Sequence, residues 1–173
     1  MRERPDFEEF AAGRARRLFQ IAYLMCGDRH QAQDLVQTAL GKMYAVWERL
    51  QFDGGDAGLD AYARKVLLRT YLSHRRLRRS SELTVERVPD APSDGAADGG
   101  AGRTELRLVL VDALAQLPPR NRAVVVLRYL EDHSVEAVAE MLGTSPAGVK
   151  SLTTRSLAKL RELLGDRDLF QSS

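Results

Sequence analysis

The chain has 173 residues, of which 44% are hydrophobic and 29% are charged, and its formal net charge is +2. This length fits one or two small domains and excludes a large multi-domain enzyme. The single cysteine, Cys26, excludes an intramolecular disulfide and a cysteine-rich zinc site.

Charge is distributed unevenly along the chain. Residues 1–80 hold 15 Lys and Arg against 10 Asp and Glu, whereas residues 81–105 hold 2 against 6. Residues 106–173 are almost neutral, with 9 against 8. An acidic segment between two basic or neutral blocks hints at a nucleic-acid partner.

Targeting and membrane signals are missing from the sequence pattern. No apolar run approaches the ~20 residues that a membrane-spanning helix needs. The charged N-terminus leads into no apolar stretch of the signal-peptide kind. We therefore expect a cytoplasmic protein without membrane insertion.

The N-terminal block predicts three helices. Apolar residues at helical spacing mark the first helix, and Gly27 ends it. Asp28 is a plausible N-cap for a second helix whose apolar stripe continues to about residue 50. The glycine-rich segment 52–59 is expected to be a loop, after which Asp60 caps a third helix that runs through residue 79.

Residues 88–102 are the clearest boundary in the chain. They contain two Pro, four Gly and three Asp. Such a segment cannot bury enough apolar area to offset its ordering entropy, so it predicts a flexible linker, with an ordered long loop as the alternative. The predicted organisation is a domain over 1–80, an acidic linker over 81–103 and a domain over 104–173.

The C-terminal block is also predicted to be helical. One apolar stripe begins at Leu106 and ends at Pro118-Pro119, because the residue before a proline resists the helical region. A second stripe takes in Ala123, Val126, Leu127 and Leu130.

A helix-turn-helix is predicted after this stripe. Ser134 caps a short helix, Gly143 begins a tight turn, and Ser145 as N-cap with Pro146 at the first position starts the last helix. No alternating strand pattern occurs. The predicted fold class is all-α, with two small helical domains joined by a flexible linker and the helix-turn-helix in the second.

The outer face of the last helix can contact DNA. It carries Lys150, Ser151, Thr154 and Arg155, whose side chains can donate to base acceptors or phosphates in the major groove. The alternative is an ordinary helical hairpin with a solvated basic face.

The segment 69–79 is a second candidate for nucleic-acid binding. It combines six basic residues with Tyr71, a pattern that suits phosphate neutralisation and base stacking. The alternative is a solvated helix end whose cations complement the helix dipole.

Trp47 and Cys26 could each have a functional role or belong to the core. Trp47 could stack on a base, but it continues an apolar stripe and is predicted to lie in the core. Cys26 and His30 are too few for a metal site, so Cys26 is predicted to be a small buried residue. We expect no metal and no cofactor.

Three aspartates could be mistaken for catalytic carboxylates. Asp53, Asp56 and Asp60 lie near glycines, without a convergent His or nucleophile, so solvated capping is favoured. The chain also contains no phosphate-binding Gly-rich motif, no nucleophile elbow and no His-Glu-x-x-His motif. We therefore expect no catalytic residues.

Three segments resemble the extracytoplasmic-function (ECF) RNA polymerase sigma factors. They are Asp-Leu-Val-Gln at 34–37, the Leu-Pro-Pro-Arg run at 117–129, and the helix-turn-helix residues within 135–161. The resemblance covers both blocks and leaves out the linker and the tails. The runs at 26–28 and 34–40 are most similar to an actinobacterial group often labelled SigE-family.

This resemblance implies a function for each part. The first domain would dock on the β′ clamp coiled coil, and it would melt and read the −10 promoter element. The second domain would read the −35 element beside the β flap. The implied docking residues are Asp34, Gln37, Leu40 and Met43. The implied −10 residues are Asp53, Gly54, Tyr62, Arg64, Lys65, Arg69, His74, Arg75 and Arg76. The implied −35 residues are Arg120, Pro146, Lys150, Ser151, Thr154 and Arg155.

The predicted function is therefore a sigma factor that binds core RNA polymerase and promoter DNA. Many members of the family are held by an anti-sigma factor, which is a further partner that the resemblance allows. The alternative is a stand-alone helix-turn-helix regulator that binds duplex operators, which would not need the Asp34 helix. A small helical hydrolase lacks any candidate constellation.

Overall fold

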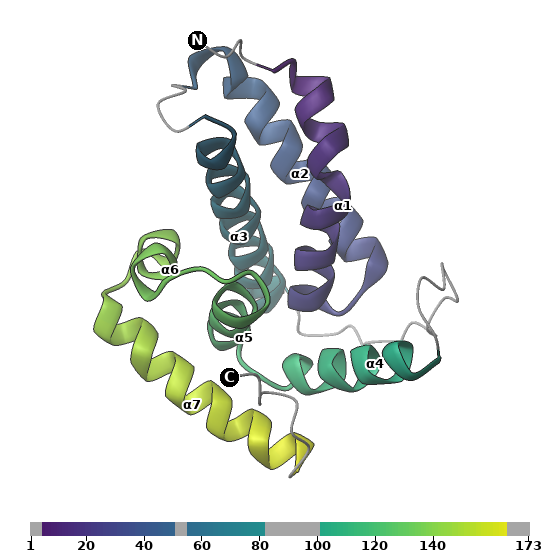
Figure 1. Ribbon diagram of the computed structural model, residues 1–173, viewed down its shortest axis with the longest axis vertical. Helices are drawn as coiled ribbons and strands as arrows, with labels where there is room; N and C mark the ends of the chain where they lie inside the picture. Colours follow the sequence, from purple (N-terminus) through teal and green to yellow (C-terminus); the bar gives the residue numbers. More distant parts are fainter. Residues whose placement is uncertain (1–4, 51–54, 82–100, 166–173) are drawn as a thin grey trace. The chain divides into compact units, whose positions relative to one another are not determined.

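The computed structural model describes residues 5–50, 55–81 and 101–165. The chain divides into two compact units, a first unit over Met1–Val85 and a second unit over Glu86–Ser173. Within the described residues every regular element is a helix, which confirms the predicted all-α class (Figure 1). Most of the predicted linker lies outside the described residues.

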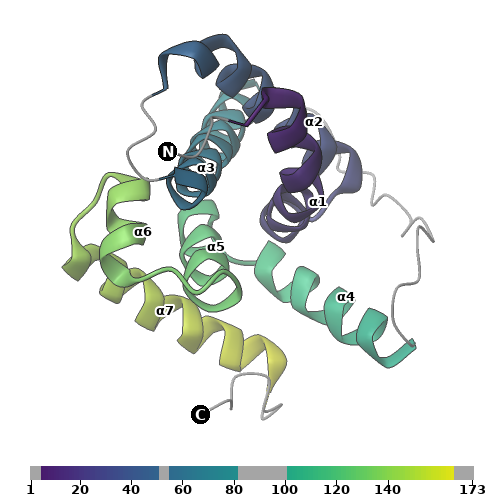
Figure 2. The same ribbon diagram turned by 45° about the horizontal axis from the view of Figure 1, so that its top comes forward.

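The first unit packs its long helices side by side (Figures 1 and 2). Its elements are α1 (Phe7–Cys26), α2 (Arg29–Val46), the short 3₁₀ helix η1 (Trp47–Arg49) and α3 (Gly55–Ser81). The second unit contains α4 (Ala101–Ala115), α5 (Pro119–Val125), the π-helical turn η2 (Val126–Leu130), α6 (Val135–Leu142) and α7 (Pro146–Leu164).

The connection between α1 and α2 follows the predicted chemistry. Gly27 ends α1 with a φ of 74°, a left-handed conformation that suits glycine. The Asp28 carboxylate accepts the backbone N–H groups of His30 at 2.8 Å and Gln31 at 3.2 Å. These bonds satisfy two of the donors that a helix start leaves unpaired.

Aromatic side chains fill one end of the first unit's core. Trp47 is 5% exposed, which confirms that it is a core residue. Its ring lies 5.2 Å from the rings of Phe7 and Phe10, a spacing at which aromatic pairs attract. Cys26 is also buried as predicted, and its thiol donates to the carbonyl of Asp28.

The start of α3 differs from the prediction. The helix begins at Gly55, so residues 55–59 of the expected loop are helical. Asp60 lies inside the helix and does not cap it, so both predictions are wrong. Leu59 is buried, and Asp60 forms an ion pair with Arg14 of α1. Tertiary contacts with α1 therefore hold a helical turn that the local glycines disfavour.

In the second unit, the predicted stripes are partly wrong. Val124 and Val125 are buried together with the predicted core residues around them, so α5 is enclosed on several sides. Leu130 is 40% exposed. The π-helical turn η2 contains an extra residue, which rotates the Leu130 side chain away from the apolar stripe of Ala123, Val126 and Leu127. Leu106 of α4, also expected inward, is 50% exposed.

The helix-turn-helix forms with its predicted caps. The Ser134 hydroxyl accepts the N–H of Ala137 at 3.0 Å, and the Ser145 hydroxyl accepts that of Gly148 at 3.1 Å. Gly143 ends α6 with a φ of 66°. Helix α7 therefore starts at a defined residue with Pro146 in its first turn.

Candidate nucleic-acid and polymerase interfaces

Helix α7 has one buried face and one exposed polar face. Val149, Ser156 and Leu160 are buried and fix the helix in the second unit. The opposite face exposes the side chains of Lys150, Ser151, Thr154, Arg155 and Pro146. Five of the six residues implied in −35 contact thus lie on a single accessible surface.

Arg120 joins this surface from another helix. It is exposed near the start of α5, and its Nη2 donates to the carbonyl of Leu142 at 3.4 Å. Leu142 is the last residue of α6, immediately before the turn. The structure therefore places the Arg120 guanidinium beside the helix-turn-helix.

Helix α3 carries a basic face made by Lys65, Arg69 and Arg76, which helical spacing places within about 40° of one another. Arg69 and Arg76 are exposed, and His74 is exposed on another side of the helix. The other implied −10 residues described on this helix are half-buried: Tyr62, Arg64, Lys65 and Arg75. Asp53 and Gly54 lie outside the described residues.

Tyr71 does not belong to the basic face. Its side chain is only 1% exposed, so the predicted base stacking by this residue is wrong. Leu67 and Leu68 are buried on the same helix, and Tyr71 extends their apolar face by one turn. The segment 69–79 therefore offers cations to a partner but keeps its aromatic ring in the core.

Helix α2 exposes two of the four implied docking residues fully. Asp34 and Gln37 are exposed and Leu40 is half-buried, but Met43 is 1% exposed. Met43 is therefore a core residue, and its implied contact with polymerase is wrong. It packs inward because it continues the stripe formed by Leu35 and Ala39.

The sequence reasoning missed Tyr44. This side chain is 68% exposed, and its ring lies 5.1 Å from that of Phe7. It follows Gln37 by seven residues, which is about two helical turns and places both on one face. That spacing indicates Tyr44, and not Met43, as a docking residue on α2.

Two further findings concern membrane-spanning helices and metal-ligand groups in the described residues. Within the described residues, no helix is both long enough and apolar enough to cross a membrane. In the same residues, no group of three or more His, Cys, Asp or Glu is placed to hold a metal ion.

Two family models match the two units. The Sigma-70 region 2 model matches residues 11–81, and the Sigma-70, region 4 model matches residues 107–160. The RNA polymerase sigma-E factor of Streptomyces coelicolor is 41% identical over 165 residues, covering 95% of this chain and 89% of the relative. The chain is an RNA polymerase sigma factor of the sigma-70 family.

Other relatives support the ECF type. The ECF RNA polymerase sigma factor SigG of Mycobacterium tuberculosis is 30% identical, with 91% of this chain and 48% of that protein covered. The Bartonella quintana sigma factor RpoE, solved in complex with the anti-sigma factor NepR, matches with a TM-score of 0.72 and 25% identity. That match covers 94% of this sigma factor and 99% of the solved chain.

Membership of this family settles the class of function. Sigma factors are non-catalytic initiation factors that bind core RNA polymerase and direct it to promoters. The stand-alone regulator is not favoured, because the region 2 match occupies a whole unit that such a regulator does not need.

Proposed function

We propose that the first unit of this sigma factor docks on polymerase and opens the −10 element, while the second unit reads the −35 element. The observation that carries the proposal is the exposed polar face of α7 on a capped helix-turn-helix. Its short Ser151 and Thr154 side chains let the helix approach base edges. Lys150 and Arg155 flank them and can donate to guanines or phosphates.

The −10 role rests on the basic face of α3. Promoter melting costs a few kcal/mol of stacking for each unpaired base, and protein contacts must offset that cost. Arg69, Arg75 and Arg76 supply cations for the backbone of the separated strand. Asp53 and Gly54 would line the pocket of a flipped base, and Tyr62 would border it.

The docking role rests on the exposed face of α2. Asp34, Gln37 and the half-buried Leu40 form a mixed polar and apolar surface, to which we add Tyr44. An exposed aromatic beside polar groups is typical of a residue that anchors a protein interface. The surface would bind the β′ clamp coiled coil, and the second unit would lie beside the β flap.

The remaining assignments concern location and regulation. We propose that the sigma factor acts in the cytoplasm, has no catalytic activity of its own and uses no cofactor. The solved RpoE structure has an anti-sigma factor bound. We extend this kind of partner to the present chain, which shares its fold over nearly the whole length.

In vitro transcription tests the proposal. Fragmented genomic DNA of the source organism is transcribed by core polymerase with and without the protein, and the RNA 5′ ends are sequenced. New discrete start sites that share two upstream motifs are the expected result. The absence of new starts with active core, together with duplex binding by the protein alone, would contradict the proposal.

A further inference from the structure

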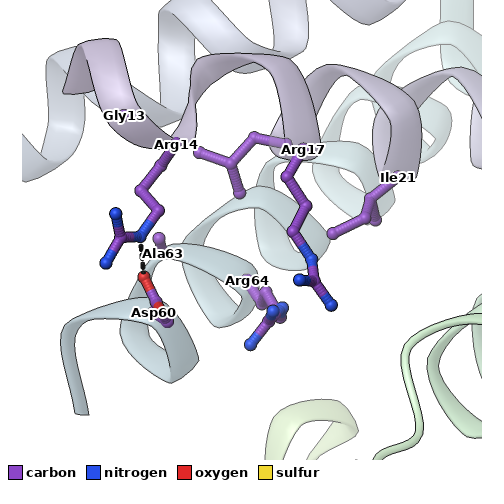
Figure 3. Close-up of a pocket in the computed structure, with 8 residues that line it drawn as sticks. Gly13, Arg14, Arg17, Ile21, Asp60, Ala63 and Arg64 are labelled. Carbon is purple, nitrogen blue, oxygen red and sulfur yellow. Dashed lines mark hydrogen bonds and ion pairs between the residues drawn. The ribbon is translucent and has the colours of Figure 1, made fainter. Parts of the chain in front are cut away.

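An ion pair between Arg14 and Asp60 joins α1 to the first turns of α3 (Figure 3). The Nε of Arg14 donates to the Asp60 carboxylate across the two helices. The side chains are 34% and 28% exposed, so each is partly enclosed by its neighbours. We call this ion pair the cross-helix pair.

Arg14 is also held from the side of α1. Its guanidinium carbon lies 5.4 Å from the centre of the Phe10 ring, a position in which the cation is attracted to the aromatic face. Phe10 is 3% exposed, and its ring lies 5.2 Å from that of Trp47. Arg14 therefore presents its guanidinium to α3 from a fixed place on the core of the first unit.

The first turns of α3 need a directional contact of this kind. They contain Gly55 and Gly58, which disfavour a helix. Leu59 and Ala63 are buried, but apolar burial has no preferred direction and lets a helix turn or slide on its neighbour. A charge-assisted hydrogen bond has a preferred distance and angle. The cross-helix pair can therefore fix the rotation of α3 about its own axis.

The cross-helix pair lies on the side of α3 opposite to the basic face. Asp60 precedes Arg69 by nine residues, which places the two about 180° apart at 3.6 residues per turn. By the same spacing, Lys65 and Arg76 lie about 140° and about 160° from Asp60. The pair is therefore not part of the basic face, and it acts on that face through the orientation of the helix.

Small rotations of α3 are large at the ends of its side chains. A rotation of about 30° moves atoms that lie about 6 Å from the helix axis by about 3 Å. This displacement equals the length of a hydrogen bond. A binding surface must be held to within about 10–20° of its working orientation, and supporting contacts behind it provide that precision.

We propose that Arg14 is a positioning residue for promoter opening, an inference that rests on the −10 role proposed for α3. Paired with Asp60, it sets the rotation of α3 and so directs the basic face toward the separated strand. Arg14 itself makes no contact with DNA in this role.

The test follows promoter opening by the holoenzyme made from core polymerase and the full chain. A promoter found by the genomic transcription experiment carries 2-aminopurine in its −10 element, and the fluorescence of this base rises when the strands separate. We expect Arg14→Gln and Asp60→Asn each to slow opening several-fold, with polymerase binding unchanged. The double variant should be no slower than either single variant, because both changes break the same pair. The unfolding temperature should fall by about 5 °C or less, since a partly exposed ion pair adds little stability.

The matched control removes an ion pair that does not join two helices. Lys159 and Glu162 lie 3.7 Å apart within α7. Lys159→Gln and Glu162→Gln are expected to leave the rate of opening unchanged.

The sign of the Asp60→Asn effect separates positioning from electrostatics. This variant removes a negative charge, so an electrostatic effect on DNA would speed opening, whereas a loss of position slows it. Faster or unchanged opening by Asp60→Asn would overturn the proposal. So would additive effects of the two changes, or a loss of polymerase binding that accounts for the slower opening.

Arg69→Gln separates this proposal from the one on which it rests. Arg69 is exposed on the basic face, so its replacement is expected to slow opening. If Arg69→Gln slows opening and the variants of the cross-helix pair do not, the positioning role fails while the −10 role of α3 stands. If Arg69→Gln leaves opening unchanged, both proposals fail.

Discussion

Arg120 and Arg122 lie two residues apart in α5 and have opposite environments. Arg122 is 1% exposed, and its Nη2 donates to the carbonyls of Ala115 at 3.0 Å and Leu117 at 3.1 Å. These carbonyls belong to the end of α4 and the turn after it, where helix acceptors need partners from outside the helix. Arg120 is exposed instead and contacts the end of α6. One arginine is therefore structural and its neighbour is available to DNA.

Replacement by alanine separates these two roles. Arg122→Ala leaves two carbonyls unpaired and opens a cavity, so we expect the second unit to lose about 3 kcal/mol of unfolding free energy. Arg120→Ala is expected to change the unfolding free energy by about 0.5 kcal/mol or less. The same variant should weaken binding to −35 DNA. Urea denaturation and DNA binding measure the two effects. Equal destabilisation by both variants would contradict the assignment.

Ser145 determines where the recognition helix α7 starts. Its hydroxyl accepts the N–H of Gly148, so Ser145→Ala is expected to cost about 1 kcal/mol of stability. Ser145→Gly should cost only a few tenths of a kcal/mol, because glycine is itself tolerated as a cap. Thermal unfolding of the two variants gives the difference. An alanine variant as stable as the glycine variant would show that the cap contributes little.

At the scale of elements, the sequence predicts the helix ends that contacts between near neighbours in the chain determine. The caps at Asp28, Ser134 and Ser145 depend on bonds to residues two or three positions away, and all were predictable. The first turns of α3 contact α1 through Asp60 and Arg14, which are 46 residues apart, and local sequence patterns do not predict such a contact.

The candidate site shows the value of local spacing. Lys150 and Arg155 lie on a face that helical spacing alone defines, and both are exposed as that spacing predicts. Met43 and Tyr71 each lie four residues after a buried residue, Ala39 and Leu67, and both are buried as well. The docking role of Met43 and the stacking role of Tyr71 conflict with this spacing, because the apolar stripe of a helix faces the core.

The proposed role of α7 is tested by a double variant. Lys150→Ala with Arg155→Ala removes two exposed cations from its first turns, so we expect −35-dependent transcription to be lost while polymerase binding stays. The matched control is Lys159→Ala with Arg161→Ala, which removes two exposed cations from the last turns of the same helix. Run-off transcription and a polymerase pull-down give the two readouts. Loss of polymerase binding in the first variant would count against the assignment of the second unit to DNA.

The docking face of α2 is tested in the same manner. Asp34→Ala with Gln37→Ala is expected to weaken polymerase binding about tenfold or more, since interface hot spots exceed about 2 kcal/mol. Both side chains are exposed, so the unfolding temperature should stay unchanged. The matched control is Asp112→Ala with Gln116→Ala, which removes an exposed carboxylate and an exposed amide from the second unit and leaves α2 unchanged. Unchanged affinity of the Asp34 and Gln37 variant for core polymerase would reject the docking role.

At the scale of the whole molecule, two small DNA-binding units act on one promoter. A single recognition helix such as α7 makes a small interface, so its own affinity for DNA is expected to be modest. When polymerase holds both units, contact by one raises the effective concentration of the other at its element. This gain disappears if the geometry prevents both units from binding at once.

Promoter geometry gives the prediction for this scale. Insertion of about 5 base pairs between the −35 and −10 elements turns the −35 major groove to the opposite side of the duplex, since a helical turn takes about 10 base pairs. We expect the holoenzyme to lose most transcription from that template, because α7 can no longer reach its bases while α3 holds the −10 element. A template with a scrambled −35 sequence and the original spacing should lose a similar amount, since it removes the same contacts. Run-off transcription on the three templates makes the comparison. Full transcription from the half-turn template would show that the two units read DNA independently, and the effective-concentration argument would then be wrong.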